Sequence, residues 1–135
     1  MTRAVTTTLH LWLRDWDIRS DSPNRTRGKH WASRARRARA AKVHVMAALA
    51  SAHWDREPVR SPVAVIVTRY LGPRERALDP DNAVAACKPL IDALVHHGVI
   101  AGDTPAHVQD VAVRSVRGGG RGVEIVVVPA LAGVR

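Results

Sequence analysis

Aromatic residues are scarce in this sequence, which contains no phenylalanine, one tyrosine and four tryptophans among 135 residues. The interior must therefore be filled mainly by valine, leucine, isoleucine and alanine. A chain of this length can bury a core without cross-links, because the buried share of the surface rises with chain length. We expect a single domain that spans residues 1–135.

Cysteine and long apolar runs are also nearly absent. The single cysteine, Cys87, excludes an internal disulfide and is typical of a reducing compartment. Its apolar, helix-like neighbours predict a buried thiol and not a nucleophile. The N-terminus has no apolar segment of signal-peptide length, and no run approaches about 18 apolar residues. We therefore expect a cytoplasmic protein with no membrane partner.

Acidic residues are few, since 12 Asp and Glu against 21 Lys and Arg give a formal net charge of +9. The excess lies in residues 19–44, which hold nine basic residues and one acid, Asp21, and so carry +8. Such a block is typical of a phosphate-binding surface and favours nucleic acid as the partner. A solvated helix face is the alternative reading. The candidate DNA-binding residues here are Arg25, Arg27, Lys29, Arg34, Arg36, Arg37 and Arg39.

Hydrophobic periodicity predicts an α+β fold with a small mixed sheet, in the element order β-α-β-α-β-β. The second strand is apolar on both faces, so we expect it in the centre of the sheet. The glycine-rich segment RGGGRG joins the last two strands, and we expect these to pair as an antiparallel hairpin that packs against the two helices. The predicted elements are strands at 6–14, 62–70, 108–116 and 122–130 and helices at 31–54 and 81–97.

Residues 77–103 hold four of the nine aspartates in this basic chain. Pro80 fixes its own φ and keeps Asp79 out of the helical region. In an extended segment Asp79 and Asp81 would point the same way, and the repulsion of two close carboxylates is relieved by a shared cation or a shared proton. Hard carboxylate oxygens favour Mg²⁺ or Mn²⁺ as the cation. The alternative is a turn in which Asp81 or Asn82 is a helix N-cap.

The helix that follows repeats polar residues on one face. Asp81, Lys88 and Asp92 are separated by about two and three helical turns, so they share a face if the helix is continuous. Pro89 predicts a kink or a new helix near that position. Lys88 could hold a phosphate beside the acids, or it could form only an i,i+4 ion pair with Asp92.

Beyond the helix, Gly98 is expected to end it and the apolar pair Val99 and Ile100 to enter the core. Asp103 then either returns toward the other acids or caps the following loop. Other sites are excluded by their residue patterns: an EF-hand loop from Asp79 would need glycine and glutamate where this chain differs. No zinc-type spacing and no phosphate-binding glycine loop is present, so we expect no organic cofactor.

The motif LDPDN … K … IDAL … HG … D in residues 78–103 resembles the RusA family of Holliday-junction resolvases, which phages and prophages often carry. The segment SPNRTRGKHWASRARR is similar to that family's basic N-terminal region, and the resemblance covers roughly residues 8–129. It implies that Asp79, Asp81 and Asp103 are metal-binding catalytic aspartates and that Lys88 is the lysine of the catalytic helix.

The resemblance further implies a crossover junction endodeoxyribonuclease, a hydrolase that cuts four-way DNA junctions with Mg²⁺ and acts as a homodimer. The chain departs from the family pattern at Leu78, where an arginine is common, and Arg74 and Arg76 are the nearby candidates to replace it. It also has Gly102 where a second acid is common. The alternative function is a non-catalytic DNA- or RNA-binding protein, such as a phage regulator.

Overall fold

A computed structural model describes residues 8–14, 16–21, 31–120 and 122–130. It has the α+β class and the mixed sheet that the sequence predicts. The strands are β1 (Leu9–Arg14), β2 (Val63–Leu71), β3 (Val108–Arg117) and β4 (Gly122–Pro129). The helices are the 3-10 turn η1 (Ile18–Asp21), α2 (Trp31–Ser51), α3 (Pro80–Ala86) and α4 (Lys88–His96).

The predicted C-terminal hairpin is wrong. The sheet order is β1-β4-β2-β3, so β2 lies between β3 and β4. β3 pairs with β2 in parallel, whereas β4 is antiparallel to both β1 and β2. The glycine-rich segment crosses the end of β2, where the Gly118 amide donates to the Leu71 carbonyl at 3.2 Å. Gly118, Gly119 and Gly120 have positive φ angles, which glycine adopts without strain and which permit this crossing.

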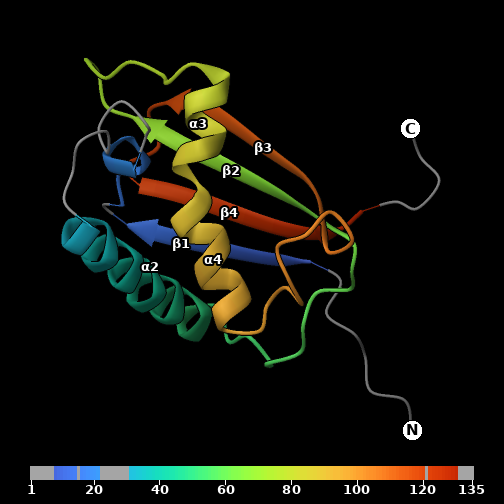
Figure 1. The fold of residues 1–135 in the computed structure, drawn as a ribbon. Coiled ribbons are helices and arrows are strands. Elements are labelled where there is room, and N and C mark those ends of the chain that lie inside the picture. The colour runs from blue at the N-terminus through green and yellow to red at the C-terminus, as the bar shows by residue number, and fades with distance from the viewer. Residues whose placement is uncertain (1–7, 15, 22–30, 121, 131–135) are drawn as a thin grey trace, which may run out of the picture.

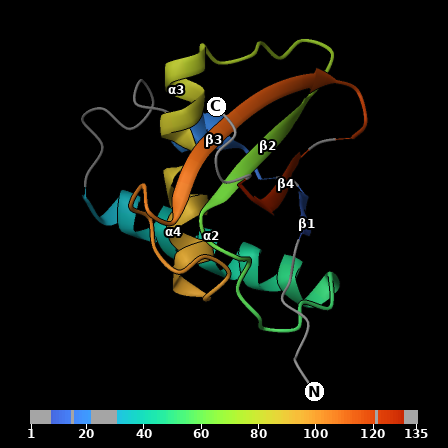
Figure 2. The ribbon, with the colours of Figure 1, turned by 90° about the vertical axis from the view of Figure 1, so that its right-hand side faces the viewer.

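The helices and the sheet form two layers (Figures 1 and 2). α3 and α4 lie across one face of the sheet, and α2 packs against α4 and β1. The predicted alternation of β1 is confirmed, because Leu9, Leu11 and Leu13 are buried while the residues between them are exposed. The central position of β2 is also confirmed.

A break divides the predicted helix 81–97 at Cys87, as the prediction from Pro89 allowed. Cys87 caps the end of α3 and precedes α4, whose Pro89 lies in the first turn, where a missing amide hydrogen costs nothing.

The predicted burial of Cys87 is confirmed, and that burial raises the pKa of its thiol to about 12. Val99 and Ile100 are buried after Gly98, as predicted. Among the described helices, none combines the length and apolarity needed to cross a membrane.

Candidate metal and nucleic-acid site

The loop between β2 and α3 positions the acidic residues, and a buried arginine holds it. Arg69 lies near the end of β2 with a side chain only 3% exposed. Its guanidinium donates to Glu75 Oε2 at 2.9 Å and to the Arg76 carbonyl at 3.0 Å, and it lies 3.6 Å from Asp17 Oδ1. A buried cation is stable only with such partners, so this part of the loop is fixed to the sheet.

A second arginine holds the same loop from β3. Arg117 donates to the carbonyls of Gly72 and Pro73 at 2.9 and 3.0 Å and to the Glu75 carbonyl at 3.2 Å. Glu75 Oε1 in turn accepts the Gly72 amide at 2.8 Å. We call Arg69, Glu75 and Arg117 the loop brace. Sequence analysis missed these residues, although an arginine within the apolar strand VAVIVTRYL signals a buried partner.

Asp79 is the N-cap of α3. Its backbone is extended (φ −63°, ψ 158°), as predicted from Pro80, and its carboxylate accepts the Asn82 amide at 3.0 Å and the Asn82 side-chain NH₂. The Asn82 backbone hydrogen bond, followed by the side-chain one, lowers the pKa of Asp79 below 3.8. The predicted N-cap at Asp81 or Asn82 is therefore wrong by two or three residues, because Pro80 occupies the first helical position.

Asp81 lies in the first turn of α3 and is exposed. The chain from residue 80 to 86 is helical, so the extended alternation expected to align Asp79 with Asp81 does not exist. Lys88 begins the next helix, and its Nζ lies 3.4 Å from Asp92 Oδ1, with the two side chains 72% and 45% exposed. The prediction that Asp81 and Lys88 share one helix face required a continuous helix. The break at Cys87 places the two residues on different helices, so that argument no longer applies.

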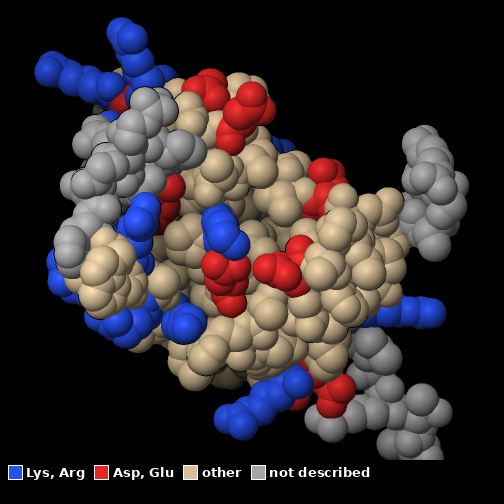
Figure 3. All heavy atoms as spheres, viewed as in Figure 1, with Lys and Arg blue, Asp and Glu red and all other residues tan. Residues whose placement is uncertain are grey.

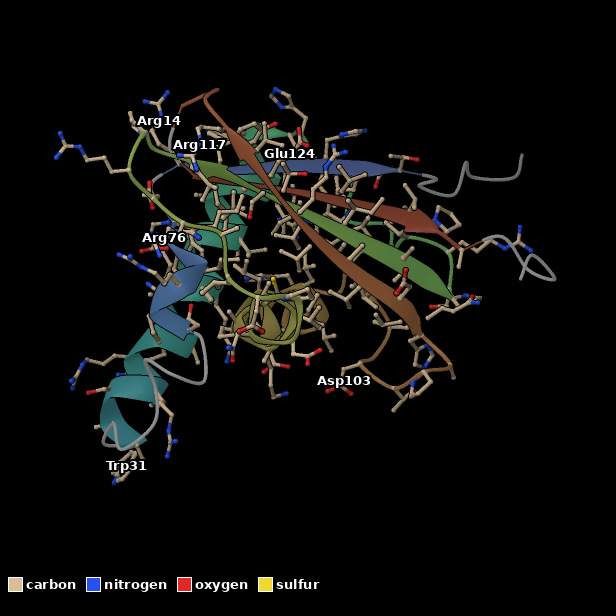
Figure 4. All side chains as sticks on the ribbon, turned by 90° about the horizontal axis from the view of Figure 1, so that it is seen from above. Arg14, Trp31, Arg76, Asp103, Arg117 and Glu124 are labelled. Carbon is tan, nitrogen blue, oxygen red and sulfur yellow. The ribbon has the colours of Figure 1, made fainter. Side chains whose placement is uncertain are left out.

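Asp103 lies in the exposed loop between α4 and β3 (Figure 4). Within the described ranges, no group of three or more His, Cys, Asp or Glu side chains could hold a metal ion. Asp103 is therefore not grouped with Asp79 and Asp81.

The two exposed carboxylates at the start of α3 nevertheless have the hard oxygens that Mg²⁺ prefers. Mg²⁺ often binds one or two carboxylates and completes its shell with water and substrate phosphate, so these residues fit such an ion.

Basic side chains border the acidic ones on one face of the molecule (Figure 3). Acidic residues lie over α3 and beside α4, and basic residues lie over α2 and the loop before α3. Of the predicted DNA-binding residues, Arg34, Arg36 and Arg39 are exposed on α2, and Arg74 and Arg76 are exposed on the loop. Arg25, Arg27 and Lys29 fall outside the residues that the structure describes.

Arg37 differs from the other arginines of α2. Its Nε and one NH₂ donate to the two carboxylate oxygens of Asp21, both at 2.8 Å, and that NH₂ also donates to the Asp17 carbonyl at 2.9 Å. Its guanidinium lies 3.7 Å from the ring centre of Trp16. Arg37 thus joins η1 to α2, and its grouping with the DNA-binding residues is not supported. Asp21, the one acid in the basic block, was the available signal for this pairing.

Comparison with known proteins adds no relative: no family model matches the chain, and no curated protein matches it significantly.

Proposed function

We propose that the protein is a structure-selective endodeoxyribonuclease that hydrolyses phosphodiester bonds in four-way DNA junctions, with Mg²⁺ or Mn²⁺ as its metal. The observation that carries the proposal is that the exposed carboxylates at the start of α3 and the half-buried carboxylate of α4 share one face of the molecule with exposed arginines of α2 (Figure 3). DNA attracted by the arginines would meet repulsion at the carboxylates, and a cation between them removes that conflict. The resemblance of residues 78–103 to the RusA family supports the same activity.

The proposed roles follow from charge and exposure. Asp79 and Asp81 hold the ion, and the resemblance alone adds Asp103 to this set. When bound, Mg²⁺ supplies charge neutralisation at the scissile phosphate and activation of the attacking water. Lys88, whose side chain is 72% exposed beside Asp92, can hold a phosphate oxygen of the bound DNA. The arginines of α2 bind phosphates of the flanking strands in their fork geometry.

The test is cleavage of an end-labelled four-way junction in Mg²⁺, compared with the linear duplex of the same sequence and with an excess of chelator. We expect paired nicks in the junction, little cutting of the duplex and none with chelator. Asp55→Asn serves as the matched control, because Asp55 also accepts a nearby amide, from Glu57 at 2.9 Å, in a turn on another part of the surface. Junction binding without any cleavage would contradict the proposal.

A second candidate is a non-catalytic DNA- or RNA-binding protein. It is favoured by the N-cap role of Asp79, whose two carboxylate oxygens both accept from Asn82. In that case the acids need no cation, and binding would be the same with Mg²⁺ or chelator. Cleavage of the junction by the wild-type protein, abolished by a substitution in α3, would exclude this candidate.

A further inference from the structure

One end of the sheet carries a group of arginines that is separate from the arginines of α2. Arg14 ends β1, Arg117 ends β3, and Arg74 follows the last residue of β2 by three positions. All three are exposed. Arg14 and Arg117 lie together at this end of the sheet, apart from Trp31 at the start of α2 (Figure 4). We call this region, with the glycine-rich segment that crosses it, the sheet end.

A groove of about 620 Å³ runs through the sheet end, between the β2–α3 loop and the glycine-rich segment. Arg74 lines it on the side of the loop, and Gly118 and Gly120 line it on the other side. Arg117 joins the two sides, because it lies beside the glycines in sequence and donates to the Gly72 carbonyl of the loop at 2.9 Å. The groove is therefore held open by the fold itself.

The glycine-rich side of the groove presents bare backbone. At Gly118 and Gly120, no heavy atom of the described residues beyond the chain neighbours lies within 4 Å of the place where a Cβ would stand. Gly119 is fixed against the Tyr70 ring, where a Cβ would lie 2.8 Å from a ring carbon. The amides of Gly119 and Gly120 donate to no group in the part of the chain that the structure describes. Successive free amides in a turn form a concavity that binds anions, and glycine lets the ligand come close.

Two arginines on either side of these amides have free guanidinium groups. Neither Arg14 nor Arg74 forms a hydrogen bond or an ion pair with another described residue. Arg14 is in register with Gly122, so it flanks the glycine-rich segment from β1, whereas Arg74 flanks it from the loop. Free guanidinium groups and backbone amides together are the donors that proteins use to hold the phosphates of a nucleic-acid strand.

The carboxylates around the sheet end already have basic partners. Arg69 lies 2.9 Å from Glu75 and 3.6 Å from Asp17. Arg114 of β3 donates to a threonine of β2 at 3.0 Å, and Glu124 of β4 pairs with that threonine from the other side, so a cation lies beside this acid too. The charge that remains without a partner at the sheet end is positive, which favours an anionic ligand.

We propose that the sheet end is a second phosphate-binding surface, which holds the backbone of one arm of a branched DNA while the exposed arginines of α2 hold another arm. The sheet end borders the β2–α3 loop, and that loop leads directly to Asp79 at the start of α3. The branched substrate comes from the proposed function, whereas the anion site follows from the sheet end alone.

Two separate surfaces predict a preference for branched DNA. A single linear duplex is expected on α2, where Arg34, Arg36 and Arg39 are exposed along one helix. A four-way junction supplies a second arm, which the sheet end can bind at the same time. Loss of the sheet end should therefore weaken junction binding and leave duplex binding nearly unchanged.

The experiment measures the affinity of the purified full chain for a labelled four-way junction and for the linear duplex of the same sequence, in chelator and over a range of salt concentrations. For the double variant Arg14→Gln and Arg74→Gln, we expect the slope of log junction affinity against log salt to decrease by about 2, which corresponds to two lost phosphate contacts. The duplex slope should stay at the wild-type value. Circular dichroism checks folding, and should the double variant unfold, Arg14→Gln alone replaces it, with an expected decrease of about 1.

The matched control is the double variant Arg56→Gln and Arg60→Gln. It removes the same charge from exposed positions that precede β2, away from the sheet end. It should bind both DNA molecules as the wild type does. An equal loss in this control would show that net charge alone governs binding and would overturn the proposal.

Unchanged junction binding in the sheet-end variant would also overturn the proposal, and equal weakening of junction and duplex would overturn the assignment of a second arm. Displacement of the junction by inorganic phosphate at constant ionic strength would assign the groove to small anions instead. A wild type without affinity for DNA would overturn both this surface and the proposed function. Because chelator is present, no result depends on cleavage: a protein that binds as predicted but never cuts contradicts only the proposed function, and a nuclease whose junction binding ignores the sheet end contradicts only the second surface.

Discussion

Arginine has two different roles in two regions of this molecule. On α2, Arg34, Arg36 and Arg39 are exposed and can bind a partner. Beneath the β2–α3 loop, Arg69 and Arg117 donate to carbonyl and carboxylate oxygens of their own chain. The difference lies in how many guanidinium donors are already used, since Arg36 donates only to the exposed Ser33 hydroxyl at 3.2 Å whereas Arg69 and Arg117 each donate to two or more oxygens of the loop. A count of charges along the sequence therefore overestimates a binding surface. Hydrogen bonding to the chain's own oxygens identifies the arginines that serve the fold, whether buried as Arg69 or exposed as Arg117.

The largest expected effect comes from removing the buried arginine of the loop brace. Arg69→Met keeps the side-chain stem but leaves the Glu75 carboxylate and the Arg76 carbonyl without their donor. We expect the free energy of unfolding to fall by about 3 kcal/mol, since half-broken buried ion pairs are costly. Arg60→Met, at an exposed arginine, should change it by less than about 0.5 kcal/mol. Urea unfolding of both variants measures the contrast, and equal changes would show that the brace does not stabilise the fold.

Adjacent arginines on α2 give the next comparison. Arg37→Ala removes the hydrogen bonds to Asp21 and the contact with Trp16, and we expect it to lower the free energy of unfolding by about 1–3 kcal/mol. Arg36→Ala removes an exposed side chain and should leave stability almost unchanged. Urea midpoints test this pair. If Arg36→Ala proved the more destabilising, the distinction between structural and surface arginines on α2 would fail.

The exposed arginines should govern DNA affinity. The triple variant Arg34→Ala, Arg36→Ala and Arg39→Ala should remain folded and bind all DNA shapes more weakly. The slope of log affinity against log salt should decrease by up to about 3, which corresponds to three lost phosphate contacts. Titration of labelled DNA over a range of salt concentrations measures the slope. An unchanged slope would place the DNA-binding surface elsewhere.

The smallest expected effect is the pH dependence of the α3 cap. Because the pKa of Asp79 is lowered in the folded state, its contribution to stability is complete above the ordinary value of 3.8 and is lost as pH falls through the lowered value. Asp79→Asn keeps an N-cap but cannot titrate. Thermal unfolding between about pH 5 and pH 2 should therefore show a shallower loss of stability in the variant than in the wild type. Parallel curves would contradict the assigned cap.

Local sequence patterns were sufficient to predict the helices and strands but not the order in which the strands pair. The alternation of Leu9, Leu11 and Leu13 and the effect of Pro89 depend on neighbours in sequence, and the structure agrees with both. The hairpin prediction failed because strand pairing depends on which strands can lie at the solvent-exposed edge of the sheet. Here β3 lies at the edge and β4 lies inside the sheet. The sequence did indicate these positions. An edge strand is solvated and β3 is rich in polar residues, whereas an inner strand is buried and β4 is a largely apolar run.

The candidate site was predicted in part for the same reason. The extended backbone of Asp79 follows from Pro80 alone, but the cap depends on the exact start of the helix. The loop brace joins residues up to 45 positions apart, as in the hydrogen bond from Arg117 to Gly72, and no local motif encodes such a contact. The position of Asp103 depends on how the α4–β3 loop folds, which spacing could not determine.

The most direct test of the proposed nuclease is the cleavage rate of a four-way junction by Asp81→Asn in Mg²⁺. Asp81 is exposed in the first turn of α3 and is not the N-cap, so the substitution should leave the fold unchanged. We predict that the variant binds the junction at least as tightly as the wild type, because a repulsive charge is gone, yet cuts it orders of magnitude more slowly. Asp55→Asn should cut at the wild-type rate. Cleavage by Asp81→Asn at the wild-type rate would contradict the assignment of a metal site to α3.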